Sequence, residues 1–508
     1  MKSFFYFNQN ESTQFGGNIY FLYLYRQNEI FYGMDNIVGR KKEIELLQRI
    51  VESKEPEFVA VYGRRRVGKT FLIKEFFNNK FTFYFSGSEN ATMKTQLQNF
   101  QIAFQNYFNM TIPTPRNWTI AFEMLRKEIS RLRKRGRKVI FIDEMPWLAT
   151  QGSNFIQAFE YWWNTYASSN PDILLIICGS STSWMLEKII KNRGGLHNRV
   201  TRQISLQPFS LKECEDFSTK YKLIIDRSQI IDYYMILGGV PYYWKQIDKS
   251  NGLPQNIDNL LFNSEAMLKD EFTKIFNSLF KNSDKYIKLI ITLGEKHIGL
   301  TRDEIVELSK LNDGGSITRM LEELEQCGFI RSYYAFGKKQ RDKIYQLIDL
   351  FSLFYLNFIF NRHPNDGNFW TNNFRTSTHN TWRDYAFEQV CLLHIPQIKN
   401  KLGISGVSTN YSAWRSTDEN SKNTAQIDLV IDRNDHIINL CEMKYSKDEY
   451  TITKEYDEIL RKRCVLFADE TKTRKAVHTT MITTYGIKRN FYFGNIQSEV
   501  KMNDLFVF

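Results

Sequence analysis

Several signatures of specialised chemistry are missing from this chain of 508 residues. Its six cysteines form no CxxC pair and most lie in apolar runs, which argues against disulfides and structural zinc and favours buried thiols in a reducing compartment. Its seven histidines form no HExxH or comparable cluster. Because no run of about 18 residues is apolar throughout, we expect no membrane span and a cytoplasmic protein.

The composition is that of an ordinary globular protein, with 42% hydrophobic and 24% charged residues. A chain of this length exceeds one hydrophobic core, so about three or four domains are expected. The formal net charge of +12 is a weak indication of polyanionic partners.

Residues 1–33 differ from the sequence that follows. They are rich in aromatic residues and are broken by polar stretches such as NQNESTQ. They lack the basic start, the continuous apolar core and the small-residue cleavage site of a signal peptide. The recognisable pattern begins at Met34, so residues 1–33 are expected to be an N-terminal extension or to precede the natural start.

Short apolar runs alternate with helical patterns in the first part of the chain. Continuous apolar strands joined by helical crossovers predict an α/β fold with a parallel sheet that is covered on both faces. The expected strands are FVAVYG (58–63), FTFYFSG (81–87), KVIFID (138–143), DILLIICGS (172–180) and RQISLQPF (202–209).

The segment GRRRVGKT has the spacing of a phosphate-binding loop, in which a glycine and four further residues precede Gly-Lys-Thr. An apolar strand leads into it and the amphipathic pattern TFLIKEFF leads out. Backbone N–H groups and the helix N-terminus would therefore cradle phosphates, whereas the alternative is a chance basic turn. Lys69 would reach the β- and γ-phosphates of ATP, and Thr70 would ligate Mg²⁺. The expected ATP-binding positions are Gly63, Arg64, Arg65, Arg66, Val67, Gly68, Lys69 and Thr70.

Two acids end the apolar strand in KVIFIDEMPWL. At the carboxyl end of a parallel strand, Asp143 would hold Mg²⁺ and Glu144 would orient or deprotonate the attacking water. The alternative is a helix N-terminus that merely favours acids. Ser180 or Ser181, after the next strand, would sense the γ-phosphate or cap the following helix. The basic run at 131–138 would either contact nucleic acid or form a solvated helix end.

Residues 284 to 350 have the pattern of a winged helix. An apolar-periodic helix is followed by TRDEIVELSKL, where Thr301 and Glu304 form a capping box, and by the helix GSITRMLEELEQ and a hairpin with the basic tip GKKQRDK. In the last helix Arg319 favours DNA contact, whereas three acids oppose it. A packing arm or an oligomer contact is the alternative. The acids are Glu322, Glu323 and Glu325.

The C-terminal part contains two adjacent strands, AQIDLVI and IINLCEMK, that carry an acid and a Glu-x-Lys pair. Asp428 and Glu442 could hold one Mg²⁺ between them, and Lys444 could stabilise a phosphorane. With Glu388 on an upstream amphipathic helix, this set resembles the core of PD-(D/E)XK nucleases, although Gln426 stands where a second acid is more usual. The alternatives are a salt-bridged sheet surface or a nuclease fold that has lost its activity.

The motifs VGRKKEIELL, GRRRVGKT, IFIDEMPWL, IICGSS and LGGVP occur in this order. Their succession resembles the archaeal-type ATPases of the AAA+-like STAND class. The resemblance implies that Val38–Arg40 lie near the adenine and that Gly239, Val240 and Pro241 contact nucleotide from a helical lid. Arg199 matches the position of an arginine of the family, with Asn198 in place of the glycine that usually precedes it.

The resemblance also implies the order of the domains and the partners. We expect ATP and Mg²⁺ as cofactors, DNA as a candidate partner, no membrane association and the option of an oligomer. One hypothesis is an ATP-dependent enzyme acting on DNA, and the other is an ATP-driven switch whose last domain only binds. The expected domains are the extension 1–33, an ASCE-type P-loop ATPase core 34–210, a helical lid 211–275, a winged helix 276–360 and a nuclease-like domain 361–508.

Overall fold

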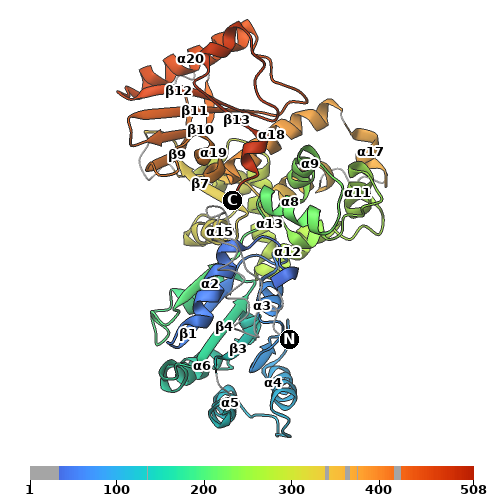
Figure 1. The fold of residues 1–508 in the computed structure, drawn as a ribbon, viewed down its shortest axis with the longest axis vertical. Coiled ribbons are helices and arrows are strands. Elements are labelled where there is room, and N and C mark those ends of the chain that lie inside the picture. The colour runs from blue at the N-terminus through green and yellow to red at the C-terminus, as the bar shows by residue number, and fades with distance from the viewer. Residues whose placement is uncertain (1–33, 134–135, 338–342, 361–365, 375, 417–424) are drawn as a thin grey trace, which may run out of the picture. The chain divides into compact units, whose positions relative to one another are not determined.

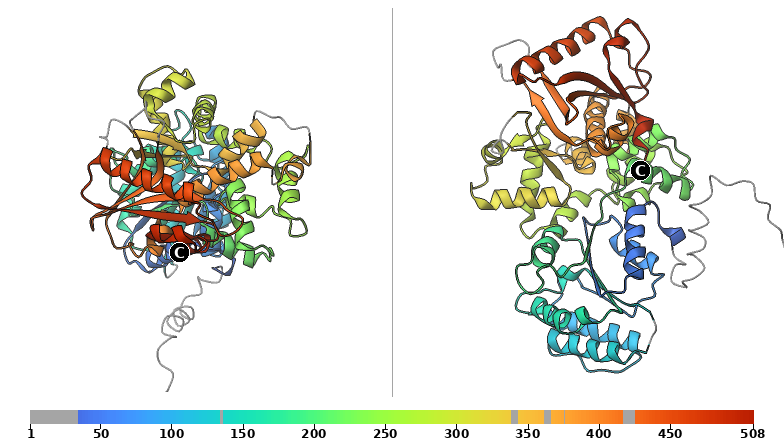
Figure 2. Two further views of the ribbon diagram at one scale, coloured as in Figure 1. Left: turned by 90° about the horizontal axis from the view of Figure 1, so that it is seen from above. Right: turned by 60° about the vertical axis from the view of Figure 1, so that its left-hand side comes forward.

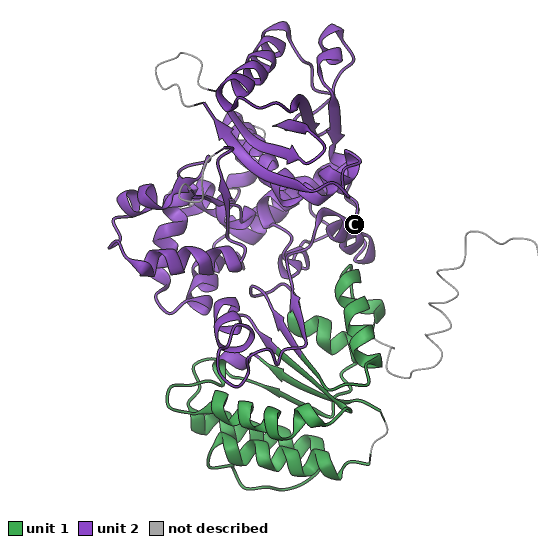
Figure 3. Cartoon of the chain, turned by 90° about the vertical axis from the view of Figure 1, so that its left-hand side faces the viewer, with its two compact units in different colours: residues 1–58, 69–143, 147–177 green, residues 59–68, 144–146, 178–508 purple. Residues whose placement is uncertain are grey.

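The computed structural model describes residues 34–508 apart from 134–135, 338–342, 361–365, 375 and 417–424 (Figure 1). The extension 1–33 lies outside the described residues, as do parts of the basic run 131–138, the hairpin tip and the segment before the last domain. The chain divides into two compact units (Figure 3). Unit 1 comprises residues 1–58, 69–143 and 147–177, and unit 2 comprises residues 59–68, 144–146 and 178–508.

Five strands form the first sheet in the order β2-β3-β4-β1-β5. The pairs β2–β3, β3–β4 and β1–β5 run parallel, as the sequence predicts. All seven residues of β4 are buried, which explains its uninterrupted apolar sequence. The strands are β1 (Glu57–Tyr62), β2 (Phe83–Ser86), β3 (Lys138–Asp143), β4 (Ile173–Gly179) and β5 (Arg202–Ser205).

Amphipathic helices supply the rest of unit 1. Phe58 of β1 packs on Phe159 and Trp163 of α6, and Trp118 at the start of α5 packs on Phe155. This aromatic core anchors the strands that lead to the phosphate loop. The helices are α2 (Lys41–Glu52), α3 (Lys69–Phe76), α4 (Met93–Phe108), α5 (Trp118–Arg131) and α6 (Phe155–Thr165).

Unit 2 begins its helical part after β4. A short helix, α7 (Thr182–Trp184), continues into a π-helical segment, η4 (Met185–Ile190). Then come α8 (Leu211–Lys220), α9 (Arg227–Leu237), α10 (Pro241–Trp244), α11 (Leu253–Ile257), η5 (Asp258–Phe262) and α12 (Glu271–Leu279). Most of residues 211–275 therefore lie in helices, and their role as a lid stays a prediction.

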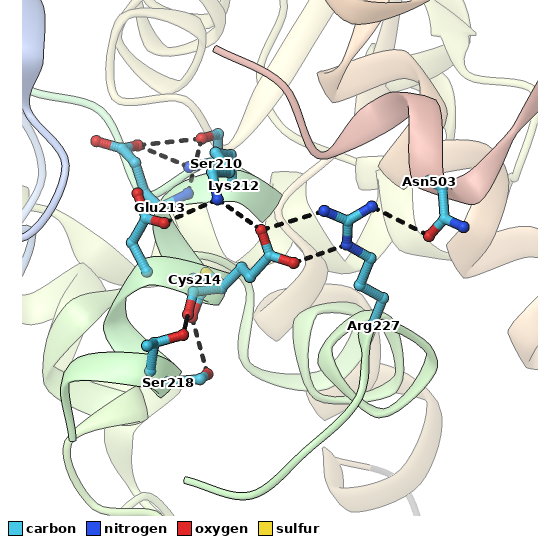
Figure 4. A network of polar contacts seen from close by, with 10 residues as sticks. Ser210, Lys212, Glu213, Cys214, Ser218, Arg227 and Asn503 are labelled. Carbon is cyan, nitrogen blue, oxygen red and sulfur yellow. Dashed lines mark hydrogen bonds and ion pairs between the residues drawn. The ribbon is translucent and has the colours of Figure 1, made fainter. Parts of the chain in front are cut away.

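The helix pair α8–α9 is fixed by local caps and by a polar network (Figure 4). Ser210 and Glu213 form a capping box at the start of α8. Arg227, the first residue of α9, donates to Glu215 over 2.7 Å and to Asn503 over 3.3 Å. This network joins the predicted lid to the C-terminal end of the chain.

The next segment contains three helices and a small antiparallel sheet of order β6-β8-β7. Thr301 and Glu304 form the predicted capping box. The elements are α13 (Ser283–Gly294), β6 (Leu300–Thr301), α14 (Arg302–Ser309), α15 (Gly315–Gln326), β7 (Ile330–Tyr334) and β8 (Lys343–Leu347), followed by α16 (Leu350–Tyr355) and η7 (Leu356–Phe360).

The last part, in orange and red in Figure 2, is built on a mixed sheet of order β13-β12-β11-β10-β9. In this sheet β9, β10 and β11 are antiparallel, and β11, β12 and β13 are parallel. Phe467 of α20 packs with Leu440 on one face of β11, whereas Cys441 on the other face neighbours Cys391 of α18. The strands are β9 (Thr409–Arg415), β10 (Gln426–Arg433), β11 (Ile437–Lys444), β12 (Ala476–Thr483) and β13 (Ser498–Lys501). The helices are α17 (Phe369–Asn373), α18 (Ser377–Leu393), α19 (Ile395–Lys401) and α20 (Lys454–Thr471), with η8 (Phe491–Asn495) and η9 (Met502–Leu505).

Two expectations concern the whole chain. All six cysteines are free thiols and five of them are buried, as their apolar surroundings predict. In the described part of the chain, no helix combines the length and the hydropathy that crossing a membrane requires.

Candidate functional site

The phosphate loop lies between the end of β1 and the start of α3. Gly63 has a φ of 142°, and a Cβ atom there would lie 2.3 Å from the carbonyl oxygen of Leu206, so only glycine fits. Gly68 has a φ of 92°, which likewise favours glycine. The two glycines thus allow the tight turn that the sequence predicts between strand and helix.

Lys69, Thr70 and Asp143 belong to unit 1. Lys69 is the first residue of α3 and is 5% exposed, and Asp143 is the last residue of β3 and is 3% exposed. The hydroxyl of Thr70 donates to Asp143 Oδ2 over 2.9 Å. These two side chains present the oxygen ligands that Mg²⁺ prefers, so the residues present fit the magnesium of bound ATP.

Glu144 and Ser180 belong to unit 2 and are joined directly. Ser180 donates to Glu144 Oε2 from its hydroxyl over 2.8 Å and from its backbone N–H over 3.3 Å. Glu144 has a φ of 45°, an unusual conformation for a residue other than glycine. Ser181 precedes α7 but makes no side-chain capping bond, so Ser180 holds the acid while neither hydroxyl caps the helix.

The arginines of the loop follow a pattern that the sequence does not reveal. Arg64 is buried and pairs with Asp349. Arg66 pairs with Glu271 over 2.7 Å, and Arg65 between them is exposed. The side chains of Arg64 and Arg66 are therefore engaged by acids of unit 2, which leaves backbone N–H groups as their means of binding phosphate.

The remaining residues expected near the nucleotide have local roles that the structure makes visible. A Cβ atom on Gly239 would lie 1.9 Å from the carbonyl oxygen of Phe209, so close backbone packing requires this glycine. Pro241 is the first residue of α10, where its fixed φ suits a helix start. Arg199 is exposed, and Arg40 is the buried residue before α2.

The C-terminal acids lie on the predicted elements, with Glu388 on α18, Asp428 on β10 and Glu442 on β11. Burial, together with the neighbouring carboxylate of Asp428, raises the pKa of Glu388 to about 8. Burial also raises the pKa of Asp428, although a hydrogen bond of 2.6 Å from Gln426 opposes the rise. Both acids are thus biased towards their neutral forms.

Glu442 has the opposite character. Its Oε1 accepts from Lys444 over 3.0 Å and from the hydroxyl of Tyr456 over 2.8 Å, and its Oε2 accepts from Arg463 over 2.6 Å. Burial opposes the charge of Glu442, but Lys444 and Arg463 hold the pKa of its carboxyl below the usual range. Tyr456 and Arg463 were not foreseen, although their spacing of seven residues places them on one face of α20.

The residues present do not fit a catalytic metal in this conformation. Across the described residues, no three His, Cys, Asp or Glu side chains are arranged to hold a metal ion. Glu388, Asp428 and Glu442 were expected to share one, but both oxygens of Glu442 are occupied by Lys444 and Arg463 together with Tyr456. Glu442 is therefore salt-bridged on this sheet, and nuclease activity stays a prediction.

A parallel sheet, a glycine-turned phosphate loop and an acidic strand end define a P-loop ATPase. Residues 37–247 match the family described as the ATPase domain predominantly from Archaea. The chain belongs to this family, and it is an ATP-binding ATPase.

Two proteins of Methanocaldococcus jannaschii are similar to this chain. One is an uncharacterized protein, 26% identical over 333 residues that make up 64% of this chain and 69% of that protein. The other is an uncharacterized ATP-binding protein, 49% identical over 49 residues that make up 10% of this chain and 83% of that protein.

Two solved structures show more distant likenesses. The Walker-type ATPase of Pyrococcus abyssi has a TM-score of 0.47 and 15% identity, covering 65% of this chain and 98% of that one. The ORC2 protein of Aeropyrum pernix, in complexes with ADPNP and ADP, has a TM-score of 0.41 and 13% identity, covering 66% and 96%.

Proposed function

We propose that this ATPase is a nucleotide-driven switch whose C-terminal domain binds single-stranded nucleic acid without cleaving it. Lys69 would bind the phosphates, Thr70 and Asp143 would hold Mg²⁺, and Glu144 would orient the attacking water with the help of Ser180. Mg²⁺ would supply charge stabilisation to the transferred phosphate.

One contact carries the proposal that nucleotide controls the rest of the chain. Arg319 of α15 pairs over 3.1 Å with Glu187 of η4, the segment that follows Ser180. A shift of Ser180 on hydrolysis would therefore displace η4 and, through the Arg319–Glu187 pair, α15. From α15 the chain continues directly into β7, so the hairpin would follow.

The hairpin in turn contacts the C-terminal sheet. Beyond β7, Ala335 bridges Ala413 of β9, and the N–H of Phe336 donates to the carbonyl of Ala413 over 2.8 Å. Phe336 also packs on Phe467 of α20 with ring centroids 4.9 Å apart. These contacts support a route from η4 through α15 to the sheet that carries Asp428 and Glu442.

The same contacts favour a packing role for the proposed winged helix over DNA reading. Arg319, the residue that favoured DNA contact, also donates to Glu323 over 3.0 Å. Glu323 accepts a hydrogen bond from Tyr286, and Glu325 accepts from Ser332. Because Arg319, Glu323 and Glu325 are already paired with other side chains of the chain, this helix has little left to offer phosphates.

The proposed nucleic-acid surface is the loop 486–495 of the C-terminal domain. Phe491 is 91% exposed, and Lys488 and Arg489 beside it are exposed as well. Asn490 holds the loop, because its side chain accepts from the N–H groups of Tyr492 and Phe493. An exposed aromatic ring on a loop with a held backbone, flanked by cations, suits stacking of an unpaired base beside a phosphate.

The surroundings of Glu442 contribute two cations, Lys444 and Arg463, while the neighbouring acids Glu388 and Asp428 have raised pKa values that favour their neutral forms. The loop is adjacent to this site. Tyr450, whose ring lies 5.7 Å from that of Tyr456, pairs with Ile487 through backbone hydrogen bonds. A strand that stacks on Phe491 would thus have its phosphates near the cations Lys444 and Arg463.

The test measures fluorescence anisotropy of a labelled single-stranded oligonucleotide with the full chain and saturating ATP or ADP. We expect salt-sensitive binding that differs between the two nucleotides, and an increase in Kd of about tenfold for Phe491→Ala. Ile224→Ala is the matched control, because Ile224 is 98% exposed on the loop between α8 and α9. Equal binding by Phe491→Ala and the parent would overturn the assigned surface, and equal binding in ATP and ADP would overturn the switch.

A further inference from the structure

We infer that the ion pair between Arg66 and Glu271 is a positioning link that sets the conformation of the phosphate loop and ties ATP affinity to the position of α12. Arg66 is the third of the four residues between the two glycines of the loop, and Glu271 is the first residue of α12. The link belongs to the ATPase and would operate whatever the C-terminal domain binds.

Glu271 is the buried centre of this contact, with 1% of its surface exposed. Its Oε2 lies 2.7 Å from a guanidinium nitrogen of Arg66, and its Oε1 accepts from the hydroxyl of Tyr243 over 2.9 Å. A buried carboxylate costs free energy unless it is paired with a cation. Loss of either Arg66 or Glu271 should therefore displace the side chain of the other. Burial raises the pKa of Glu271 even though Arg66 opposes the rise.

A second contact fixes the direction of the Arg66 side chain. Its guanidinium lies over the ring of Tyr242, 4.3 Å from the centroid. Tyr242 and Tyr243 are the second and third residues of α10, directly after Val240 and Pro241. One loop arginine therefore contacts both α10 and α12, which the sequence predicts to be parts of the nucleotide lid.

The backbone of Arg66 explains why this side chain should matter for phosphate binding. Its φ is 70°, in the left-handed region that residues other than glycine rarely adopt. Such a conformation persists only where surrounding contacts enforce it. Because the N–H groups of this loop must point towards the phosphates, holding Arg66 in this conformation pre-organises the loop.

Thermodynamic linkage then gives the contact a regulatory consequence. If the Arg66–Glu271 pair favours the loop conformation that binds phosphate, bound ATP must favour the pair to the same extent. ATP would hold α12 against the loop, and displacement of α12 would release ATP. Neither residue needs to touch the nucleotide with its side chain.

Arg64 shows by contrast what a purely structural pair looks like. It is fully buried with Asp349, lies over the ring of Phe329 at 5.1 Å, and its partner also caps α16 through Ser352. The Arg66 side chain is 26% exposed, so part of it reaches solvent although the two paired atoms are buried. The Arg66 pair is therefore the one that can open without unfolding its surroundings.

The experiment measures ATP affinity, kcat and melting temperature of the full chain for Glu271→Gln, Arg66→Lys and the exchange Arg66→Glu with Glu271→Arg. We expect Glu271→Gln to raise the Kd for ATP about tenfold, with kcat at saturating ATP within about twofold of the parent. Arg66→Lys should retain most of the affinity, and the exchange should recover part of what Arg66→Glu alone loses.

The matched control is Asp457→Asn. Asp457 is also a buried carboxylate that pairs with an arginine, Arg461, and accepts a hydrogen bond from Asn495, but it belongs to α20 of the C-terminal domain. The control should lower the melting temperature and leave the Kd for ATP unchanged. If Glu271→Gln behaves like this control, or if the exchange recovers none of the affinity, the link is only structural and the inference is wrong.

Discussion

The hydroxyl of Ser180 donates to Glu144 over 2.8 Å, so the residue after β4 holds the acid that follows β3. Glu144 sits in a left-handed backbone conformation, and its carboxylate is oriented by a neighbour. An acid that activates water must be oriented before the reaction. We therefore expect Glu144 to act on the attacking water and Ser180 to orient Glu144.

Replacement of Glu144 by glutamine should separate ATP binding from hydrolysis. The amide keeps the size of the side chain and can still bond to Ser180, but it cannot accept a proton. We expect kcat to fall about 100-fold or more, with the Kd for ATP unchanged. Phosphate release and equilibrium binding measured on the same preparation check this, and hydrolysis at the parental rate would show that Glu144 is not the base.

Removal of the Ser180 hydroxyl should have a smaller effect on the same step. Loss of one hydrogen bond to a carboxylate is worth about 1.5 kcal/mol, or about tenfold in kcat, for Ser180→Ala. Ser180→Thr keeps the hydroxyl and serves as the control. In a Glu144→Gln background the Ser180→Ala change should add almost nothing, because the two residues act on one step.

Lys69 should govern ATP binding rather than chemistry. Its ammonium would supply a charge-assisted hydrogen bond to the phosphates, so Lys69→Ala should remove most nucleotide binding. Isothermal titration with ATP in the presence of Mg²⁺ measures this directly. Lys74, on the same helix, is a suitable control because it lies over the ring of Tyr84 at 4.2 Å and points to a packing contact.

The acids of the C-terminal sheet predict how stability depends on pH. The pKa of Glu388 is raised to about 8 in the folded protein, so between its ordinary value and pH 8 the folded state holds a proton that the unfolded state has lost. The stability that Glu388 contributes is therefore complete at low pH and is lost as the pH rises through about 8. Glu388→Gln should flatten this decline, which melting curves at pH 5 and pH 8 will test.

The engagement of both Glu442 oxygens by Lys444, Tyr456 and Arg463 predicts that manganese has no specific effect on the C-terminal sheet. Melting curves of the full chain without nucleotide should not shift when Mn²⁺ is added. Asp428→Asn should then resemble the parent in this assay. An Mn²⁺-dependent rise that Asp428→Asn abolishes, together with cleavage of DNA, would restore the nuclease hypothesis.

Local sequence patterns predicted the elements that carry the sites. The strand limits 138–143 and 437–444 coincide with β3 and β11, because both strands are buried and bounded by turn residues. The capping box at Thr301 is equally local, since it needs only residues three apart. Patterns of this kind lie within short stretches of sequence, so they can be recognised without knowledge of the fold.

Long-range pairing could not be predicted in the same way. Arg64 and Asp349 are 285 residues apart, and neither local sequence indicates that the two residues pair. The same holds for Glu442. Its strand pattern predicts a metal ligand, but its carboxylate pairs with Arg463 of α20, which the pattern does not reveal. Side-chain charges predict that partners exist, whereas the fold decides which partners they are.

Hydrogen–deuterium exchange on Glu144→Gln with ATP or with ADP tests the central claim most directly. If nucleotide state reaches the C-terminal sheet through Arg319 and Glu187, peptides from η4, α15 and β9 should exchange at different rates in the two states, and Glu187→Gln should abolish the difference at β9. Differences confined to the phosphate loop and the first sheet would contradict the proposed switch.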